Sequence, residues 1–187
     1  MTKNTVIDSH QHFWDVSKLD YSWMPDDDPV LNRNFMPVDL RPLILDAGVD
    51  RTVIVQAHHS MEETYWLLDL AEKTDFVAGV VVWVDLADPD VGKILDRLMG
   101  HRYFSGVRHN WHDESDQGWV LQKKVLRGLK ELASRGIAYD LLSRPHHLAY
   151  IPKLLEAVPG LRTVIDHISK PLIAEGVTEP WSTDLEI

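Results

Sequence analysis

The feature that most constrains the fold of this chain is a repeated alternation between short runs rich in β-branched apolar residues and longer stretches with helical spacing. In these stretches, apolar residues recur at steps of three and four, as at Val125, Leu129 and Leu132, which is the period of an amphipathic helix. The short runs occupy residues 5–8, 52–55, 76–84, 104–108, 137–141 and 162–165. Nearly all-apolar strands that alternate with helices predict an α/β fold whose parallel sheet is covered on both faces.

The helix boundaries carry their own chemical signals. Ser60, followed three residues later by Glu63, predicts a capping box at the start of a helix. Gly136 follows a helical stretch and precedes a strand-like run. A residue with a left-handed backbone often ends a helix, and glycine adopts this conformation with the smallest steric penalty. The helix is therefore expected to end at Gly136.

Two parallel architectures are compatible with this alternation. A doubly wound sheet usually has a glycine-rich phosphate loop after its first strand, but here the first run leads into Asp8-Ser9-His10-Gln11-His12, and the first glycine is Gly48. In a (β/α)8 (TIM) barrel, side chains at the carboxyl ends of several strands converge on one site. Polar groups lie at or just after the carboxyl ends of all six runs: His10, His12, Gln56, His58, Asp85, Arg108, His109, Asp140, Asp166 and His167. The pattern therefore favours the barrel.

The length of the chain predicts that the barrel is incomplete. A (β/α)8 barrel typically needs about 250 residues, and six strands account for nearly all of the 187 residues. A seventh strand is missing, because residues 180–185 have the pattern of a helix opening. We therefore expect a single barrel-type domain over residues 1–187 that lacks its last two βα units and leaves two unpaired sheet edges.

Composition narrows the class of function. A formal charge of -10 argues against sequence-blind nucleic-acid binding, which depends on cations that neutralise phosphates. The absence of cysteine excludes disulfides, thiol catalysis and cysteine-ligated metals. Residues 1–6 lack the apolar segment of a secretory signal, and no apolar run approaches the ~18 residues of a membrane span. We expect a cytoplasmic protein without nucleic-acid or membrane partners.

Two histidines at the end of the first run form a candidate metal-binding pair. Alternate side chains of a strand share one face, so His10 and His12 can both reach one ion at about 2.1 Å, the usual Zn–N distance. A His-x-His pair also arises by chance in a chain with ten histidines. Its position at a strand end favours the functional interpretation over a hydrogen-bonded structural pair.

A carboxylate, an imidazole and an amine follow the sixth run within five residues, at Asp166, His167 and Lys170. They can hold a substrate carboxylate or carbonyl, and the alternative is a helix cap with a surface lysine. If the strand stays regular, alternation turns only one of Asp166 and His167 inward, and the other orients its neighbour. Arg108, at the end of the fourth run, offers a fork for a carboxylate or lactone oxygen, with a salt bridge across the barrel top as the alternative.

The segment 13–36 is long for a connection in a compact domain. It holds an acidic run, Asp26-Asp27-Asp28, and several aromatic residues, among them Trp14, Tyr21, Trp23 and Phe35. A loop of this length is commonly a functional lid, and we favour that interpretation. The alternative is an ordered surface loop whose aromatic side chains pack on the barrel rim.

Five motifs run through the chain in order: Asp8-Ser9-His10-Gln11-His12-Phe13-Trp14, Val55-Gln56 with Glu63-Thr64, Gly106-Val107-Arg108-His109, Tyr139-Asp140-Leu141-Leu142 and Ile165-Asp166-His167-Ile168-Ser169-Lys170-Pro171. Together they resemble the amidohydrolase superfamily, in the sugar-lactonase branch that includes fuconolactonase-like and rhamnonolactonase-like hydrolases. The resemblance covers the whole chain, and its last motif is the most specific. It implies a distorted (β/α)8 barrel that hydrolyses a sugar-acid or related lactone to the open acid.

The resemblance also implies roles for individual residues. As catalytic residues it implies His10, His12, His167 and Asp166, of which the three histidines are also the metal ligands. As substrate-binding residues it implies Gln56, Arg108, Asp140 and Lys170. Metal-dependent relatives often carry a carboxylated lysine and a histidine where this chain has Arg108 and Asp140. The resemblance therefore implies at most one divalent ion, zinc-like, and metal-free operation stays open.

The leading hypothesis is a lactone hydrolase of carbohydrate metabolism, or the N-terminal two-thirds of one. The catalytic aspartate of the family follows an eighth strand and has no counterpart here, so we expect little activity from the 187-residue chain. One rival is a metal-dependent decarboxylase of the same superfamily. The other is a non-catalytic degenerate barrel that binds a sugar acid or a partner chain. The expected partner is a small molecule, and the open edges also predict a homo-oligomer.

Overall fold

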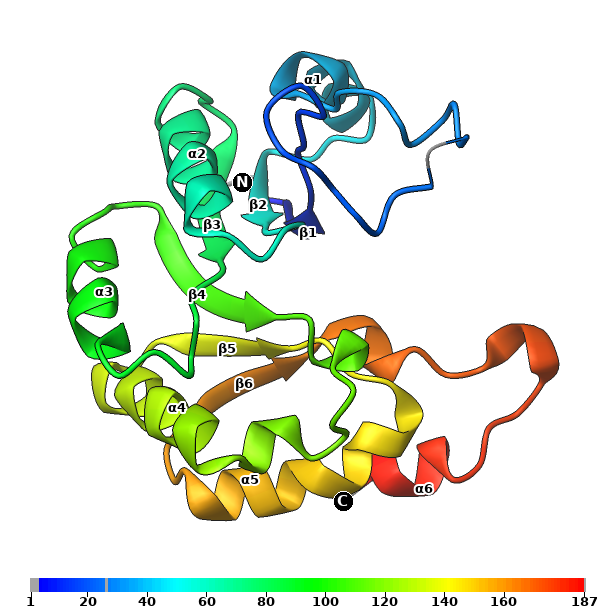
Figure 1. Cartoon of the computed structure of the whole chain (residues 1–187). Coiled ribbons are helices and arrows are strands. Elements are labelled where there is room, and N and C mark those ends of the chain that lie inside the picture. The colour runs from blue at the N-terminus through cyan, green and yellow to red at the C-terminus, as the bar shows by residue number, and fades with distance from the viewer. Residues whose placement is uncertain (1–3, 26, 187) are drawn as a thin grey trace. The chain divides into compact units, whose positions relative to one another are not determined.

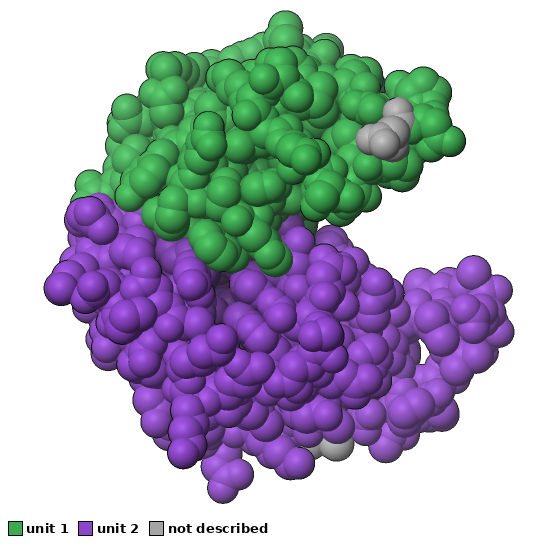
Figure 2. Space-filling model, in the orientation of Figure 1, with its two compact units in different colours: residues 1–83, 100–105 green, residues 84–99, 106–187 purple. Residues whose placement is uncertain are grey.

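The computed structural model describes residues 4–25 and 27–186, in two compact units (Figure 2). The first unit comprises Met1–Trp83 and Gly100–Ser105, and the second comprises Val84–Met99 and Gly106–Ile187. Two features discussed above lie partly outside the described residues. These are the N-terminus, at residues 1–3, where no secretory signal is predicted, and the acidic run, at Asp26. A single domain over the whole chain stays a prediction.

The first unit contains a parallel sheet with one helix after each of its first two strands. Its helices are α1 (Pro37–Asp46) and α2 (Met61–Glu72), and its strands are β1 (Ile7–Gln11), β2 (Arg51–Val55) and β3 (Val77–Val82). The sheet order is β1-β2-β3, with Asp8 opposite Thr52 and Val55 opposite Val81. Ile54 and Leu67 are fully buried in its core.

The second unit repeats this pattern. Its strands are β4 (Phe104–His109, from Gly106 onward), β5 (Ala138–Leu141) and β6 (Arg162–Ile165), and its α-helices are α3 (Val91–Leu98), α4 (Lys123–Arg135), α5 (Ile151–Ala157) and α6 (Trp181–Leu185). Short 3-10 helices lie at η1 (Trp111–Asp113), η2 (Trp119–Leu121), η3 (Pro145–Tyr150), η4 (Asp166–Ser169) and η5 (Ile173–Glu175). The arrows of β4, β5 and β6 point the same way (Figure 1), so the residues that follow these strands gather at one edge.

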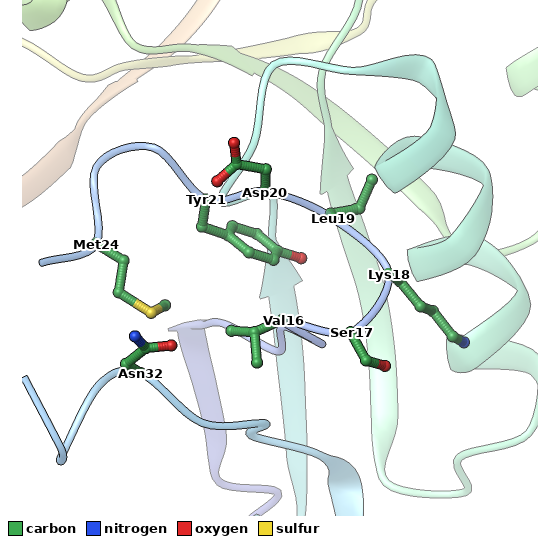
Figure 3. A pocket seen from close by; sticks show the side chains of 8 residues that line it. All are labelled: Val16, Ser17, Lys18, Leu19, Asp20, Tyr21, Met24 and Asn32. Atoms are coloured by element: carbon green, nitrogen blue, oxygen red, sulfur yellow. The ribbon is translucent and has the colours of Figure 1, made fainter. Parts of the chain in front are cut away.

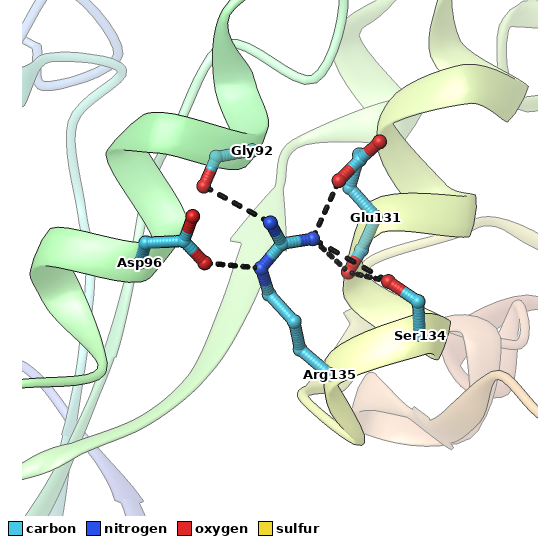
Figure 4. A network of polar contacts seen from close by, with 5 residues as sticks. All are labelled: Gly92, Asp96, Glu131, Ser134 and Arg135. Carbon is cyan, nitrogen blue, oxygen red and sulfur yellow. Dashed lines mark hydrogen bonds and ion pairs between the residues drawn. The ribbon is translucent and has the colours of Figure 1, made fainter.

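The periodic stretches form the helices that they predict. Val125, Leu129 and Leu132 of α4 are fully buried, and the helix ends at Gly136, whose φ of 66° is left-handed. Arg135, in the last turn of α4, joins it to α3 (Figure 4). Its guanidinium donates to the Asp96 carboxylate at 2.7 Å, to the Glu131 carboxylate and to the Gly92 carbonyl. An arginine network therefore fixes two neighbouring helices of this unit.

The first strand is displaced from its predicted range. Residues 5–8 are the most apolar, yet β1 runs over Ile7–Gln11. The pairing of β1 with β2 continues past the apolar residues as far as Gln11. Gln11 lies opposite Ile54, and its side-chain amide donates to the Thr52 hydroxyl at 3.2 Å. His10 therefore lies within the strand. No helix among the described residues combines the length and apolarity required to cross a bilayer.

Candidate functional site

The first unit brings together His10, which lies in β1, and His12, which follows the strand. His10 and His12 face the same side, and their Nε2 atoms lie 3.3 Å apart. The Nδ1 atom of His12 lies 2.7 Å from the carbonyl oxygen of Val55. Because a carbonyl can only accept, Nδ1 carries the proton of a neutral His12 ring, and its Nε2 has the lone pair.

This histidine pair fits a divalent metal ion. Metal-bound histidines usually donate their second ring nitrogen to a carbonyl or carboxylate, which fixes the tautomer, and Val55 serves His12 in this way. Two tetrahedral ligands at about 2.1 Å from zinc are separated by about 3.4 Å, close to the 3.3 Å between the two Nε2 atoms. The donor atoms and their spacing therefore match two positions of a zinc site. The same distance is that of a hydrogen bond between the two rings, as in the structural-pair alternative.

Gln56 follows β2, and Glu63 of α2 brings a buried carboxylate to the loop after this strand. Gln56 and Glu63 are both fully buried. Ser60 caps α2, since its hydroxyl accepts the Glu63 amide at 3.1 Å, which is the N-cap half of the predicted capping box. The Glu63 carboxylate accepts the amides of Ala57 and His58, the latter at 2.8 Å. The capping signal did not reveal this second role, in which Glu63 holds the loop after β2.

The described residues of the segment 13–36 pack as part of the first unit. Its indole and phenol groups are anchored, because the Trp23 Nε1 donates to the Ala57 carbonyl at 2.9 Å and Tyr21 is 4% exposed. A cavity of about 410 Å³ lies within the segment. Figure 3 shows its lining residues, which are Val16, Ser17, Lys18, Leu19, Asp20, Tyr21, Met24 and Asn32. These contacts match the packed-loop alternative, and a lid role stays a prediction.

In the second unit, three of the predicted site residues gather at the ends of β4, β5 and β6. The Arg108 guanidinium donates to the Asp166 carboxylate at 3.0 Å, and both side chains are 4% exposed. Arg108 also lies opposite Asp140 in the β4–β5 register. The salt-bridge alternative for Arg108 is therefore observed, with a partner on the neighbouring motif.

Asp140 has the electrostatic environment of a group that exchanges protons near neutral pH. Burial and the nearby charge of Asp166 raise the pKa of Asp140 to about 7, although the Arg108 cation acts in the opposite direction. A carboxyl group with such a pKa is partly protonated at pH 7, so it can both donate and accept a proton.

His109, which follows Arg108, is held as a neutral ring. Burial lowers the pKa of His109 to about 4, despite the charges of Asp85 and Asp113. Its ring stacks on Trp119 with centroids 4.0 Å apart, and its Nε2 lies 2.7 Å from Glu114. A neutral His109 therefore donates its Nε2 proton to the Glu114 carboxylate.

The sequence after β6 departs from regular strand geometry. His167, Ile168, Ser169 and Lys170 all have positive φ angles, between 46° and 58°, which non-glycine residues adopt at a cost of about 1–2 kcal/mol each. The expectation that strand alternation turns one of Asp166 and His167 inward therefore does not apply, because β6 ends at Ile165. Asp166 is buried and His167 is exposed, and this backbone turn is what separates them.

The model of the amidohydrolase family matches residues 7–186, and the chain belongs to this family. Two similar proteins are the L-fucono-1,5-lactonases of Burkholderia ambifaria, 39% identical over 94% of this chain, and of Burkholderia multivorans, 33% identical over 90%. The chain spans 60% and 57% of their respective lengths.

A solved structure supports the same assignment. The crystal structure of an amidohydrolase from Burkholderia multivorans with bound zinc matches 97% of this chain, with a TM-score of 0.87 and 31% identity. The chain covers 65% of that structure. The predicted fold class, six βα units of a (β/α)8 barrel, and the resemblance to the sugar-lactonase branch of the amidohydrolases are confirmed.

Proposed function

We propose that this protein is a hydrolase that opens the lactone ring of a sugar acid, with L-fucono-1,5-lactone as the first candidate substrate. The observation that carries the proposal is the His10–His12 pair, whose Nε2 atoms are spaced for a metal ion in a chain 39% identical to a named L-fucono-1,5-lactonase. A cytoplasmic location and a place in carbohydrate metabolism belong to the same proposal, as does a homo-oligomeric state.

His10 and His12 are proposed to hold one divalent ion, with His167 as a third ligand. An ion at this pair supplies Lewis-acid polarisation of a carbonyl and a lower pKa for a bound water. The Val55 carbonyl keeps the His12 ring in the tautomer that leaves Nε2 available. Operation without metal is the competing hypothesis, and zinc binding by the chain separates the two.

Zinc binding is expected to depend on the histidine pair. The His12→Ala variant should bind Zn²⁺ at least about 100-fold more weakly than the unchanged chain, because it loses one ligand and its oriented partner. Competition with a chromophoric chelator measures this affinity, and His167→Ala tests the third ligand. The matched control is His101→Ala, since His101 pairs with Glu72 elsewhere in the first unit. Equal affinity in the His12→Ala and His101→Ala variants would contradict the proposed site.

The residues of the second unit are proposed to bind the substrate oxygens and to transfer the proton that the ring oxygen receives. In ring opening, the oxygen of water bonds to the carbonyl carbon and the bond from that carbon to the ring oxygen breaks. One proton of the water ends on the ring oxygen, and the other is released when the product acid ionises. Asp140, with a pKa of about 7, holds the substrate and supplies the proton to the ring oxygen.

The other proposed roles follow from charge and hydrogen-bonding capacity. Asp166 is the proposed catalytic carboxylate, oriented by its hydrogen bond from Arg108. Arg108 and Lys170 are proposed to bind electron-rich oxygens of the lactone, and the Gln56 amide to bind a sugar hydroxyl. Arg108 thereby has two proposed roles. Its hydrogen bond positions the Asp166 carboxylate, and its positive charge attracts the substrate oxygens.

A substrate panel tests the reaction class. The zinc-loaded chain is incubated with L-fucono-1,5-lactone and, separately, with 2,6-dihydroxybenzoate, while acid release is followed by pH-stat and carbon dioxide by gas analysis. We expect acid release above the spontaneous rate from the lactone and its loss in the Asp140→Asn variant. Carbon dioxide release would favour the decarboxylase, and sugar-acid binding without any acid release would favour the non-catalytic barrel. Ring opening at an ordinary enzymatic rate would contradict the expectation of little activity.

A further inference from the structure

Three loops of the second unit that carry basic side chains are joined to one another by short hydrogen bonds. The backbone amide of His112 donates to the Leu142 carbonyl at 3.0 Å. The Ser143 and Ser169 hydroxyls lie 2.6 Å apart and both residues are fully buried. Arg144 follows Ser143 and Lys170 follows Ser169. The three basic residues His112, Arg144 and Lys170 are therefore brought to one place by their neighbours in the chain.

The charges of these residues act strongly on one another. Burial, followed by the repulsion of Arg144 and Arg108, lowers the pKa of Lys170, against the attraction of Asp113 and Asp166. Burial and the Lys170 cation lower the pKa of His112 to about 4. The two carboxylates offset only part of this repulsion, since the pKa of Lys170 is still lowered. An anionic ligand would relieve the rest.

His112 adds a hydrogen-bond acceptor to the cations. Its Nε2 lies 3.0 Å from the Asp113 carboxylate, and a neutral ring therefore donates there and keeps the lone pair on Nδ1. That Nδ1 is buried and, within the described part of the chain, has no hydrogen-bond partner, and the side chain is 11% exposed. A ligand hydroxyl group can satisfy this acceptor, whose lack of a partner costs about 1–3 kcal/mol.

The charges that act on Lys170 favour a ligand with a single negative charge. Arg108, Arg144 and Lys170 are cations, and Asp113 and Asp166 are the facing carboxylates. Three cations against two anions leave one positive charge, with the Asp140 carboxyl only partly ionised at neutral pH. A monocarboxylate matches this balance, whereas a phosphate dianion exceeds it.

We infer that His112, Arg144 and Lys170 form a binding subsite for a 2-hydroxy carboxylate. Arg144 and Lys170 bind the carboxylate, and Nδ1 of His112 accepts the proton of the adjacent hydroxyl group. The identification of this ligand with the ring-opened sugar acid rests on the proposed function, because lactone hydrolysis leaves a carboxylate next to the C2 hydroxyl. The subsite makes the enzyme sensitive to inhibition by its own product.

The test is an NMR titration of the chain with glycolate, acetate, inorganic phosphate and L-fuconate. Glycolate should bind about fivefold more tightly than acetate, which lacks the hydroxyl group, and more tightly than phosphate. Arg144→Gln and Lys170→Gln should each weaken glycolate binding about tenfold. Arg144 is exposed, so its variant is expected to fold. The controls are Arg97→Gln and Lys153→Gln, which remove the same charges from exposed positions on α3 and α5.

The outcomes separate the subsite from the proposed reaction. Glycolate affinity unchanged in Arg144→Gln, equal affinity for acetate and glycolate, or tighter binding of phosphate would each overturn the subsite. Glycolate binding with the expected variant pattern, but no binding of L-fuconate, would support the subsite and count against a sugar-acid lactone as the substrate. His112→Ala should abolish the preference for glycolate over acetate while it retains acetate binding.

Discussion

The Gly128→Ala variant is expected to be destabilised by about 2–3 kcal/mol, the upper part of the range that overpacking produces in well-packed interiors. A Cβ atom at position 128 would lie 2.1 Å from the carbonyl oxygen of Leu86 and 2.9 Å from its carbonyl carbon. Alanine in a helix interior gains about 1 kcal/mol over glycine, but a backbone atom cannot move aside as a side-chain end can. Helix α4 must therefore shift away from Leu86, and urea unfolding measures the loss.

Gly92→Ala is the matched control, because Gly92 is also in a helix. A Cβ atom there would meet the Glu131 carboxylate oxygen at 2.8 Å and the Arg135 guanidinium at 3.2 Å. Both are ends of flexible side chains in the network of Figure 4, so they can yield. The stability of this variant is expected to stay within about 1 kcal/mol of the unchanged chain. Equal losses in the two variants would show that close backbone packing at Gly128 is not the cause.

The Arg108→Met variant is expected to lose about 3–5 kcal/mol, because it leaves the Asp166 carboxylate buried without its cation. Both side chains of the pair are 4% exposed, so water cannot replace the lost partner. The double variant Arg108→Met/Asp166→Leu should recover most of this loss, since replacing a buried pair by apolar residues is often neutral. The four stabilities of a double-mutant cycle, from urea unfolding, give the coupling.

Arg41→Met provides the comparison for this cycle. The Arg41–Asp75 pair is solvent-exposed, and its removal should leave the unfolding midpoint almost unchanged, because exposed pairs are screened by water and salt. A loss in Arg41→Met as large as that in Arg108→Met would contradict burial as the reason. A double variant no more stable than Arg108→Met would mean that packing, rather than the unpaired charge, causes the loss.

The regular elements were largely predictable because their periodicity is local. The run 162–165 coincides with β6, and the helical spacing around Val125 and Leu129 lies within α4. The bounds of β1 were predicted incorrectly from the run 5–8. Hydrophobicity indicates which part of a strand is buried, whereas hydrogen bonding to the neighbouring strand decides where the strand ends. Gln11 shows the difference, since its side chain bonds to Thr52 of the neighbouring strand.

The candidate site was predictable in part. His10 and His12 followed from the two-residue period of a strand, and the structure gives their Nε2 atoms a metal-compatible spacing. Arg144 was not predicted, because nothing in its neighbours along the chain marks it as part of a site. Its association with Lys170 depends on a hydrogen bond between Ser143 and Ser169, which are 26 residues apart.

The sequence by itself determined the α/β class, the six βα repeats and the strand ends that carry polar groups. These depend on local hydrophobic period and on the general rule that parallel strands present their carboxyl ends together. Only the tertiary structure decided which groups are charged and which are exposed. The raised pKa of Asp140 and the left-handed turn that exposes His167 beside a buried Asp166 both arise from non-local packing. Desolvation and charge proximity are set by residues far apart in the chain, and a linear pattern does not contain them.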